Sequence, residues 1–117
     1  MMNKRLVQVI VFVMIALLLV PLLASPAFGS ELATPGAQLF EAHCAGCHLN
    51  GGNIVRRGKT LKQRAMEKNG YTSIEAIASL VTQGKGNMSA YGDKLSPAEI
   101  QAVSRYVFEQ AQVHWQK

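Results

Sequence analysis

The stretch HCAGCHLNGGN, residues 43–53, holds both cysteines of the chain and two of its three histidines. At its centre, Cys44 and Cys47 are separated by Ala and Gly, and His48 follows directly. Three kinds of site use two cysteines at this spacing: a redox dithiol, part of a zinc site, and a covalent haem anchor. The rest of the chain decides between them.

The context of this stretch argues against the first two kinds. A thioredoxin-type dithiol requires a βαβ context, and no strand pattern precedes Cys44. A structural zinc site usually takes its ligands from two separated pairs, whereas His43, Cys44, Cys47 and His48 crowd onto one helical turn. A plain disulfide between the two cysteines would close a very small loop and stabilise little.

The haem interpretation accounts for both the spacing and the histidine. The two thiols add across the vinyl groups of haem as thioethers, and the histidine beside them becomes an axial ligand of the iron. We therefore predict that Cys44 and Cys47 bind one haem c covalently and that His48 is the proximal iron ligand. His43 is expected to be a surface or lining residue rather than a ligand.

The first 29 residues have the features of a secretory signal peptide. Lys4 and Arg5 form a basic start, residues 6–23 are almost entirely apolar, and the small residues ASPAFGS follow. We expect cleavage at about residues 27–29, after Ala27 or Gly29, which leaves no stable membrane insertion. The alternative is an uncleaved anchor, because about 18 apolar residues just span a bilayer. Both alternatives export the chain, and cytochrome c maturation also takes place outside the cytoplasm.

Composition limits the exported part to one small domain, residues 30–117. A domain of this size buries only about 60–65% of its unfolded surface, so a cofactor or other cross-link is a common requirement. The whole chain has a formal net charge of +5, and without Lys4 and Arg5 ten basic residues remain against seven acidic ones, a net of +3. One basic cluster, residues 56–64, stands out. It is too modest to indicate nucleic acid as a partner, and is either a solvated face or a surface for docking or for pairing with haem propionates.

Four helices are predicted, and no strand pattern is present. They cover residues 34–47, 60–70, 72–84 and 96–115. The expected N-caps are Thr34, Thr60, Thr72 and Ser96, and capping boxes are expected for Thr72 with Glu75 and for Ser96 with Glu99. Two Gly-rich polar loops separate the helices, and each is short enough to belong to a compact domain.

A six-coordinate electron carrier needs a second axial ligand. The candidates in the exported part are Met66, Met88, His43 and His114. Met66 falls inside a predicted helix, where core packing is the commoner role, and His114 is expected to face solvent. Met88 lies in the loop GKGNMSAYG, where backbone freedom allows the thioether to point inward. We predict that His48 and Met88 are the axial iron ligands.

Several motifs, in this order, resemble the cytochrome c6 family of cyanobacterial and algal thylakoid lumens: GAQLFEAHCAGCH, GGN, KTL, QGKGNM and LSPAEIQAVSRYVFEQA. The resemblance covers nearly all of the exported part. It implies an all-α class I cytochrome c fold, with four helices around one covalently bound haem c. It also implies a small, soluble, monomeric one-electron carrier of the thylakoid lumen or periplasm that is not an enzyme.

The resemblance also implies roles for individual residues. Gly36, Phe40 and Tyr106 match positions where the first and last helices cross, and Trp115 matches a terminal aromatic. Three further residues match positions near the haem or its propionates: Asn53, Lys59 and Lys94.

Two positions depart from the usual family pattern. Ser89 stands where a proline commonly follows the ligand methionine, so a less stiff ligand loop is expected. By the resemblance, Leu80 is expected to pack on the haem, at the position where the photosynthetic donors carry a glutamine. By resemblance, Leu or Ile here marks the c6-like paralogues of the B and C types, which have lower reduction potentials than true cytochrome c6. We therefore expect a lowered potential, although the physics of losing an amide dipole does not fix the sign.

Three other functions stay open at this point. A true cytochrome c6 would carry electrons from cytochrome b6f to photosystem I, and the redox partners in general are expected to be cytochrome b6f, photosystem I or a terminal oxidase. A haem peroxidase-like enzyme or ligand sensor would require an open sixth position and a polar distal group, and no His or Arg lies beside Met88 in the sequence. A haem subunit of a larger oxidase or reductase would require that the N-terminal segment is not cleaved and serves as a membrane anchor.

Overall fold

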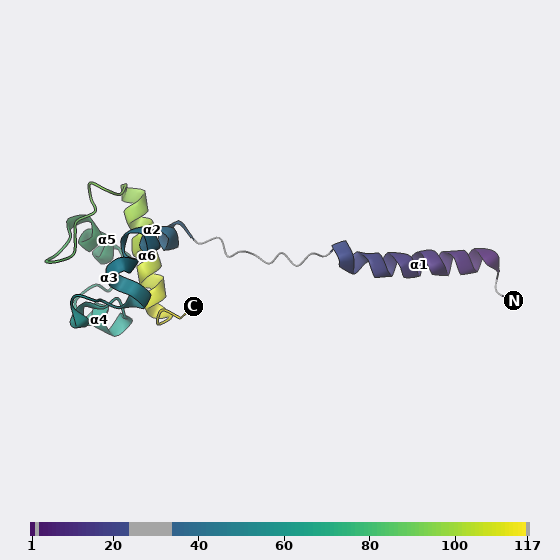
Figure 1. The fold of residues 1–117 in the computed structure, drawn as a ribbon, viewed down its shortest axis with the longest axis horizontal. Coiled ribbons are helices and arrows are strands. Elements are labelled where there is room, and N and C mark those ends of the chain that lie inside the picture. The colour runs from purple at the N-terminus through teal and green to yellow at the C-terminus, as the bar shows by residue number, and fades with distance from the viewer. Residues whose placement is uncertain (2, 24–33, 117) are drawn as a thin grey trace. The chain divides into compact units, whose positions relative to one another are not determined.

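The structure, a computed structural model, describes residues 1, 3–23 and 34–116 (Figure 1). The chain divides into two units, residues 1–32 and 33–117. The first unit contains the helix α1 (Lys4–Leu23). None of the helices in the described ranges has the length and hydropathy that a membrane crossing requires. The predicted cleavage region at residues 27–29 lies outside the described residues, so cleavage stays a prediction.

The second unit is helical. Its elements are α2 (Pro35–His43), α3 (Ala45–His48), η1 (Leu49–Gly51), η2 (Arg57–Lys59), α4 (Gln63–Lys68), α5 (Ile74–Gln83) and α6 (Pro97–Gln112). Within residues 34–116 the one β-type pairing is an isolated bridge between Lys85 and Met88. The prediction of an all-α unit with helices in four places is therefore confirmed.

Two of the four predicted helix starts are correct. The Thr34 side chain accepts a hydrogen bond from the Ala37 amide, and Ser96 forms a full capping box with Glu99. The prediction for Thr72 is wrong, because Ser73 caps α5 and accepts from the Ala76 amide at 3.1 Å.

The predicted start at Thr60 is also wrong. Thr60 is extended, with φ −71° and ψ 160°, and α4 begins only at Gln63. The neighbouring Leu61 amide donates to the Gly51 carbonyl at 2.8 Å. This bond ties the segment to a loop ten residues earlier and delays the helix.

The helix predicted over residues 34–47 is divided at Cys44, which has φ −119°. The Cys44 amide still donates to the Phe40 carbonyl at 2.8 Å, and its own carbonyl accepts from the amides of Cys47 and His48. The backbone bonds therefore continue through a bend. As a result, Cys47 and His48 lie on a separate short turn, α3.

The core forms where α2 and α5 pack against α6 (Figure 1). A Cβ on Gly36 would lie 2.3 Å from the Ala102 carbonyl oxygen, so only glycine allows α2 to approach α6 this closely. About one turn further along α2, the centroid of the Phe40 ring lies 5.4 Å from that of the Tyr106 ring and 5.0 Å from that of the Trp115 ring. The packing roles predicted for these residues are thus observed.

Candidate haem-binding site

The core of the second unit surrounds a cavity of about 250 Å³ that is partly open to solvent. Six buried core side chains also form its wall: Phe40, Met66, Ile77, Val81, Val103 and Val107. The helices therefore close around a space that their own side chains do not fill, and this space is mainly apolar.

The structure brings seven of the eight predicted site residues to this cavity. The residues that line it are Cys44, Cys47, His48, Asn53, Lys59, Leu80 and Met88. Lys94 is outside the lining, and its ammonium nitrogen lies 5.2 Å from the centroid of the Tyr91 ring. A position of Lys94 beside the propionates stays a prediction.

The His48 ring is oriented by a main-chain atom. Its Nδ1 lies 2.8 Å from the Gly52 carbonyl oxygen. Because a carbonyl only accepts, Nδ1 carries the hydrogen, and Nε2 of the neutral ring is left with a free lone pair. Histidines that bind metals are commonly fixed in this way. The role of Gly52 could not be predicted from the sequence, because every residue has a main-chain carbonyl and the residue type does not show which one accepts this bond.

The loop that carries Gly52 is held by the C-terminal end of the chain. Gly51 has φ +72°, and a Cβ on it would lie 2.4 Å from the Trp115 indole nitrogen. The Trp115 Nε1–H donates to the Leu61 carbonyl at 2.9 Å, and the Leu61 amide donates to the Gly51 carbonyl. Trp115 therefore supports the His48 loop from behind.

The two cysteines lie at the cavity as free thiols, Cys44 half-buried and Cys47 exposed. Burial, and then the neighbouring Cys47, raise the pKa of the Cys44 thiol to about 11. Before any thioether forms, this thiol is therefore protonated at neutral pH. Among the described residues no group of three or more His, Cys, Asp or Glu is placed to hold a metal ion, so the zinc interpretation gains no support.

Met88 sits in a backbone turn that follows α5. The amides of Lys85 and Met88 each donate to the other residue's carbonyl at 3.0 Å. Gly84 has φ +67°, and a Cβ on it would lie 2.6 Å from the Met88 carbonyl oxygen. The loop returns to α5 where the Tyr91 amide donates to the Val81 carbonyl at 2.9 Å. The backbone of Met88 is thus fixed on both sides, and its half-buried side chain lines the cavity.

The wall between η1 and α4 is organised by two asparagines. The Asn53 side chain accepts from the Arg56 amide at 2.7 Å and donates to the Lys59 carbonyl at 3.0 Å. The Asn69 side chain accepts from the Lys59 ammonium and donates to the Ala65 carbonyl at 2.7 Å. Asn69 was not predicted; a single Asn before Gly at the end of a predicted helix is a weak signal.

The remaining candidates for an axial ligand are placed as follows. His43 is exposed and contributes to the cavity lining, and His114 is exposed and lies outside it. Met66 is 5% exposed and belongs to the core, although it also touches the cavity. The predicted positions of these three residues are therefore observed.

Tyr91 links the Met88 loop to α2, because its hydroxyl donates to the His43 carbonyl at 2.9 Å. Burial, and then the charges of Cys44 and Cys47, raise the pKa of the Tyr91 hydroxyl. The phenol therefore stays neutral and keeps its proton for this bond.

These residues fit a covalently bound haem. The cavity is mainly apolar, both thiols reach it, and the imidazole has Nε2 free. A thioether on a fixed loop also lines it.

Comparison with known proteins gives the same answer. A family model described as cytochrome C oxidase, cbb3-type, subunit III, matches residues 31–107. A protein of Nostoc sp. named cytochrome c6-like is 52% identical over 99 residues, which cover 85% of this chain and 88% of that protein. The chain belongs to the cytochrome c6 family.

Solved structures of cytochrome c6 relatives agree with the fold. Cytochrome c6C from Synechococcus sp. PCC 7002 is 82% identical, with a TM-score of 0.67, and the match covers 68% of this chain and 96% of that one. Cytochrome c6B from Synechococcus sp. WH8102 is 53% identical, with a TM-score of 0.68 over 71% and 94% of the two chains. The class I cytochrome c fold and the resemblance to B- and C-type paralogues are confirmed. As a member of this family the protein is a small electron-transfer protein with covalently bound haem c.

Proposed function

We propose that this cytochrome c6-like protein is a one-electron carrier in which Cys44 and Cys47 form the thioethers and His48 and Met88 are the axial ligands. The observation that carries the proposal is that all four side chains line one apolar cavity. Haem c bound there supplies reversible one-electron chemistry at iron. The protein needs to perform no bond chemistry of its own.

The chain's own residues have three tasks in this proposal. The Gly52 carbonyl holds the His48 ring and its tautomer. The paired backbone of Lys85 and Met88 limits the movement of the thioether. Buried side chains such as Phe40 and Val103, 2% and 1% exposed, keep water away from the centre of the site. A dry, fixed environment lowers the reorganisation that accompanies each electron transfer.

Leu80 is proposed to give this protein a lower reduction potential than a true cytochrome c6. Its side chain reaches the cavity from α5, where a glutamine would place an amide dipole. We expect Leu80→Gln to raise the midpoint potential in a redox titration, because the substitution restores the group that the photosynthetic donors use. Ser79→Gln is the matched control: Ser79 is the neighbouring residue, exposed and outside this cavity. An unchanged potential in Leu80→Gln would remove the argument from Leu80.

The site of action is proposed to be the thylakoid lumen or the periplasm. The signal-peptide features of residues 1–29 support export followed by cleavage. Mass spectrometry of the mature N-terminus tests this, and an intact residue 1 on the haem-loaded protein would instead favour an anchored subunit. Its redox partners are proposed to be cytochrome b6f, photosystem I or a terminal oxidase. The description of the matching family model, which names an oxidase subunit, is a reason to include the oxidase.

A further inference from the structure

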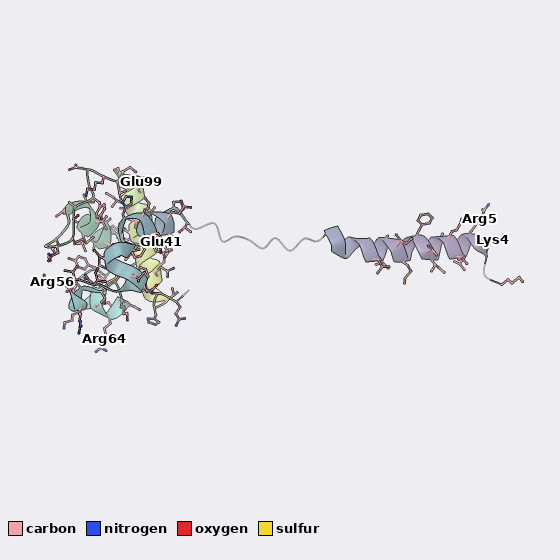
Figure 2. All side chains as sticks on the ribbon, in the orientation of Figure 1. Lys4, Arg5, Glu41, Arg56, Arg64 and Glu99 are labelled. Carbon is pink, nitrogen blue, oxygen red and sulfur yellow. The ribbon has the colours of Figure 1, made fainter. Side chains whose placement is uncertain are left out.

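Charge is distributed unevenly over the second unit. Residues 42–66 contain five basic side chains and no Asp or Glu. The rest of residues 34–116 has four basic and six acidic side chains, a net of −2. In Figure 2, Arg56 and Arg64 lie beside α3 and α4, whereas Glu41 and Glu99 lie at α2 and the start of α6. The segment of residues 42–66 is therefore strongly positive, and the remainder of the described second unit is weakly negative.

The basic side chains of this region are accessible. The five cations, all exposed, are Arg56, Arg57, Lys59, Lys62 and Arg64. Lys59 is bonded to Asn69. Within the described part of the chain, the side chains of the other four form no hydrogen bond or ion pair. Their charges are thus not neutralised by the protein itself.

Exposed apolar side chains accompany these cations. Leu49, Ile54 and Val55 are 63%, 74% and 56% exposed. Val55 and Arg56 also line the cavity, and the Ile54 amide donates to the Cys47 carbonyl at 3.0 Å. The surface formed by Leu49, Ile54, Val55, Arg56, Arg57 and Arg64, called here the basic–apolar surface, therefore adjoins the haem anchor.

We propose that the basic–apolar surface is the docking surface for a redox partner protein whose own surface is acidic. This rests on the proposed function, because the partner must exchange an electron at the adjacent site. Arginine is enriched at protein interfaces, and the buried centre of an interface is more apolar than the rest of the protein surface. Opposite charge accelerates encounter, and it does so most at low ionic strength.

A protein fits this surface better than an anionic membrane does. Peripheral membrane binding generally uses a helix with a long apolar face. Here the three apolar side chains lie at η1 and in the loop before η2, and the neighbouring α4 has only six residues. Residues 84–94, several of which also line the cavity, carry Lys85 and Lys94 against Asp93, so this segment offers much less positive charge than the basic–apolar surface.

The test compares two charge reversals of equal size in the haem-loaded protein. Arg57→Glu changes the basic–apolar surface, and Arg105→Glu changes an exposed arginine on α6 outside it. Electron transfer to an acidic blue-copper protein is followed by stopped flow over a range of ionic strength. We expect Arg57→Glu to slow transfer about tenfold at low salt and to flatten its salt dependence. Arg105→Glu should change the rate by less than about twofold, and neither variant should alter the midpoint potential.

Further arms of the experiment separate the outcomes. Ile54→Ser should slow transfer at every ionic strength, because it removes apolar contact rather than charge. Equal slowing by both arginine variants, or no slowing by either, would overturn the proposal. So would binding to phosphatidylglycerol vesicles that is lost in Arg57→Glu while the rate to the copper protein is unchanged. Titration of both oxidised proteins measures docking without electron transfer. If the wild-type protein binds the copper protein and Arg57→Glu does not, but no electron is transferred, the proposed function fails and the docking surface stands.

Discussion

The two loops that carry the proposed axial ligands are held in different ways. On the His48 side, side chains from distant segments meet: Trp115 bonds to Leu61 and packs on Gly51, and Gly52 bonds to the imidazole. On the Met88 side, most of the bonds are local: the backbone bonds to itself and to the end of α5, and the Tyr91 hydroxyl adds a bond to the distant His43 carbonyl. Ser89 is exposed and follows the proposed ligand Met88, at a position where a proline would stiffen the loop.

This difference indicates where the site is most easily disturbed. The His48 loop is braced by residues far apart in sequence, so it yields only when the packing behind it is lost. The Met88 loop depends on local backbone geometry, above all at Gly84. We therefore infer that any loosening of the iron coordination begins on the Met88 side.

The largest effect is expected from Gly84→Ala. Gly84 has φ +67°, and the added Cβ would lie 2.6 Å from the Met88 carbonyl oxygen, so the loop must shift. We expect a loss of about 2 kcal/mol or more in the free energy of unfolding, together with weaker methionine coordination. Denaturant unfolding and the near-red absorbance of the ferric protein measure the two effects.

Gly58→Ala is the control for this substitution. Nothing lies within 4 Å of a Cβ at Gly58, and no positive φ is recorded there. It should leave both measurements nearly unchanged. A Gly84→Ala protein as stable as Gly58→Ala would contradict the view that the Met88 loop depends on Gly84.

A smaller effect is expected from Trp115→Phe on the opposite side. The ring is largely kept, but the N–H that bonds to the Leu61 carbonyl is lost. An unsatisfied, partly buried carbonyl costs about 1–2 kcal/mol, which denaturant unfolding would report. The near-red band should persist, because the Met88 loop is untouched. Loss of that band in Trp115→Phe would show that the two sides are not separately held.

The smallest effect is expected at the start of α6. Hydrogen bonds from the Ser96 backbone and side chain lower the pKa of the exposed Glu99. Because the folded pKa is below the unfolded one, the stabilisation is present above the unfolded value, near 4.5, and is lost as the pH falls through the folded value.

Thermal unfolding of Glu99→Gln checks this. We expect a slightly lower Tm than wild type at neutral pH and no difference in strong acid. Glu109→Gln, an exposed residue of the same helix outside the capping box, should show no such pH dependence. A Tm difference for Glu99→Gln that grows on acidification would contradict the capping role.

Much of this architecture could be predicted because the deciding signals are local. The spacing of Ser96 and Glu99 alone indicates the start of α6. The cysteine–histidine motif likewise indicates covalent haem binding. Thr60 and Thr72 were wrongly predicted as N-caps, because a residue type that favours the N-cap position does not require a helix to start there. A bond from Leu61 to Gly51 keeps Thr60 extended, and Ser73, one residue after Thr72, takes the cap.

The contacts that shape the site were beyond sequence reasoning for a different reason. The Gly52 carbonyl that orients His48 is a main-chain atom, and the bond from the Lys59 ammonium to Asn69 depends on how α4 lies against η2. Neither contact can be identified until the three-dimensional fold is known. Met88 was preferred to Met66 as the predicted ligand because it lies outside a predicted helix, and its role as a ligand stays a prediction.

The central claim, that His48 and Met88 hold the iron from opposite loops, is tested most directly by the absorbance spectrum of the ferric protein. Wild type should show a near-red charge-transfer band from methionine sulfur to Fe(III), and Met88→Ala should lack it. Met66→Leu, which keeps the buried volume, should retain the band. A wild-type protein without the band, or a Met88→Ala protein that keeps it, would contradict the account.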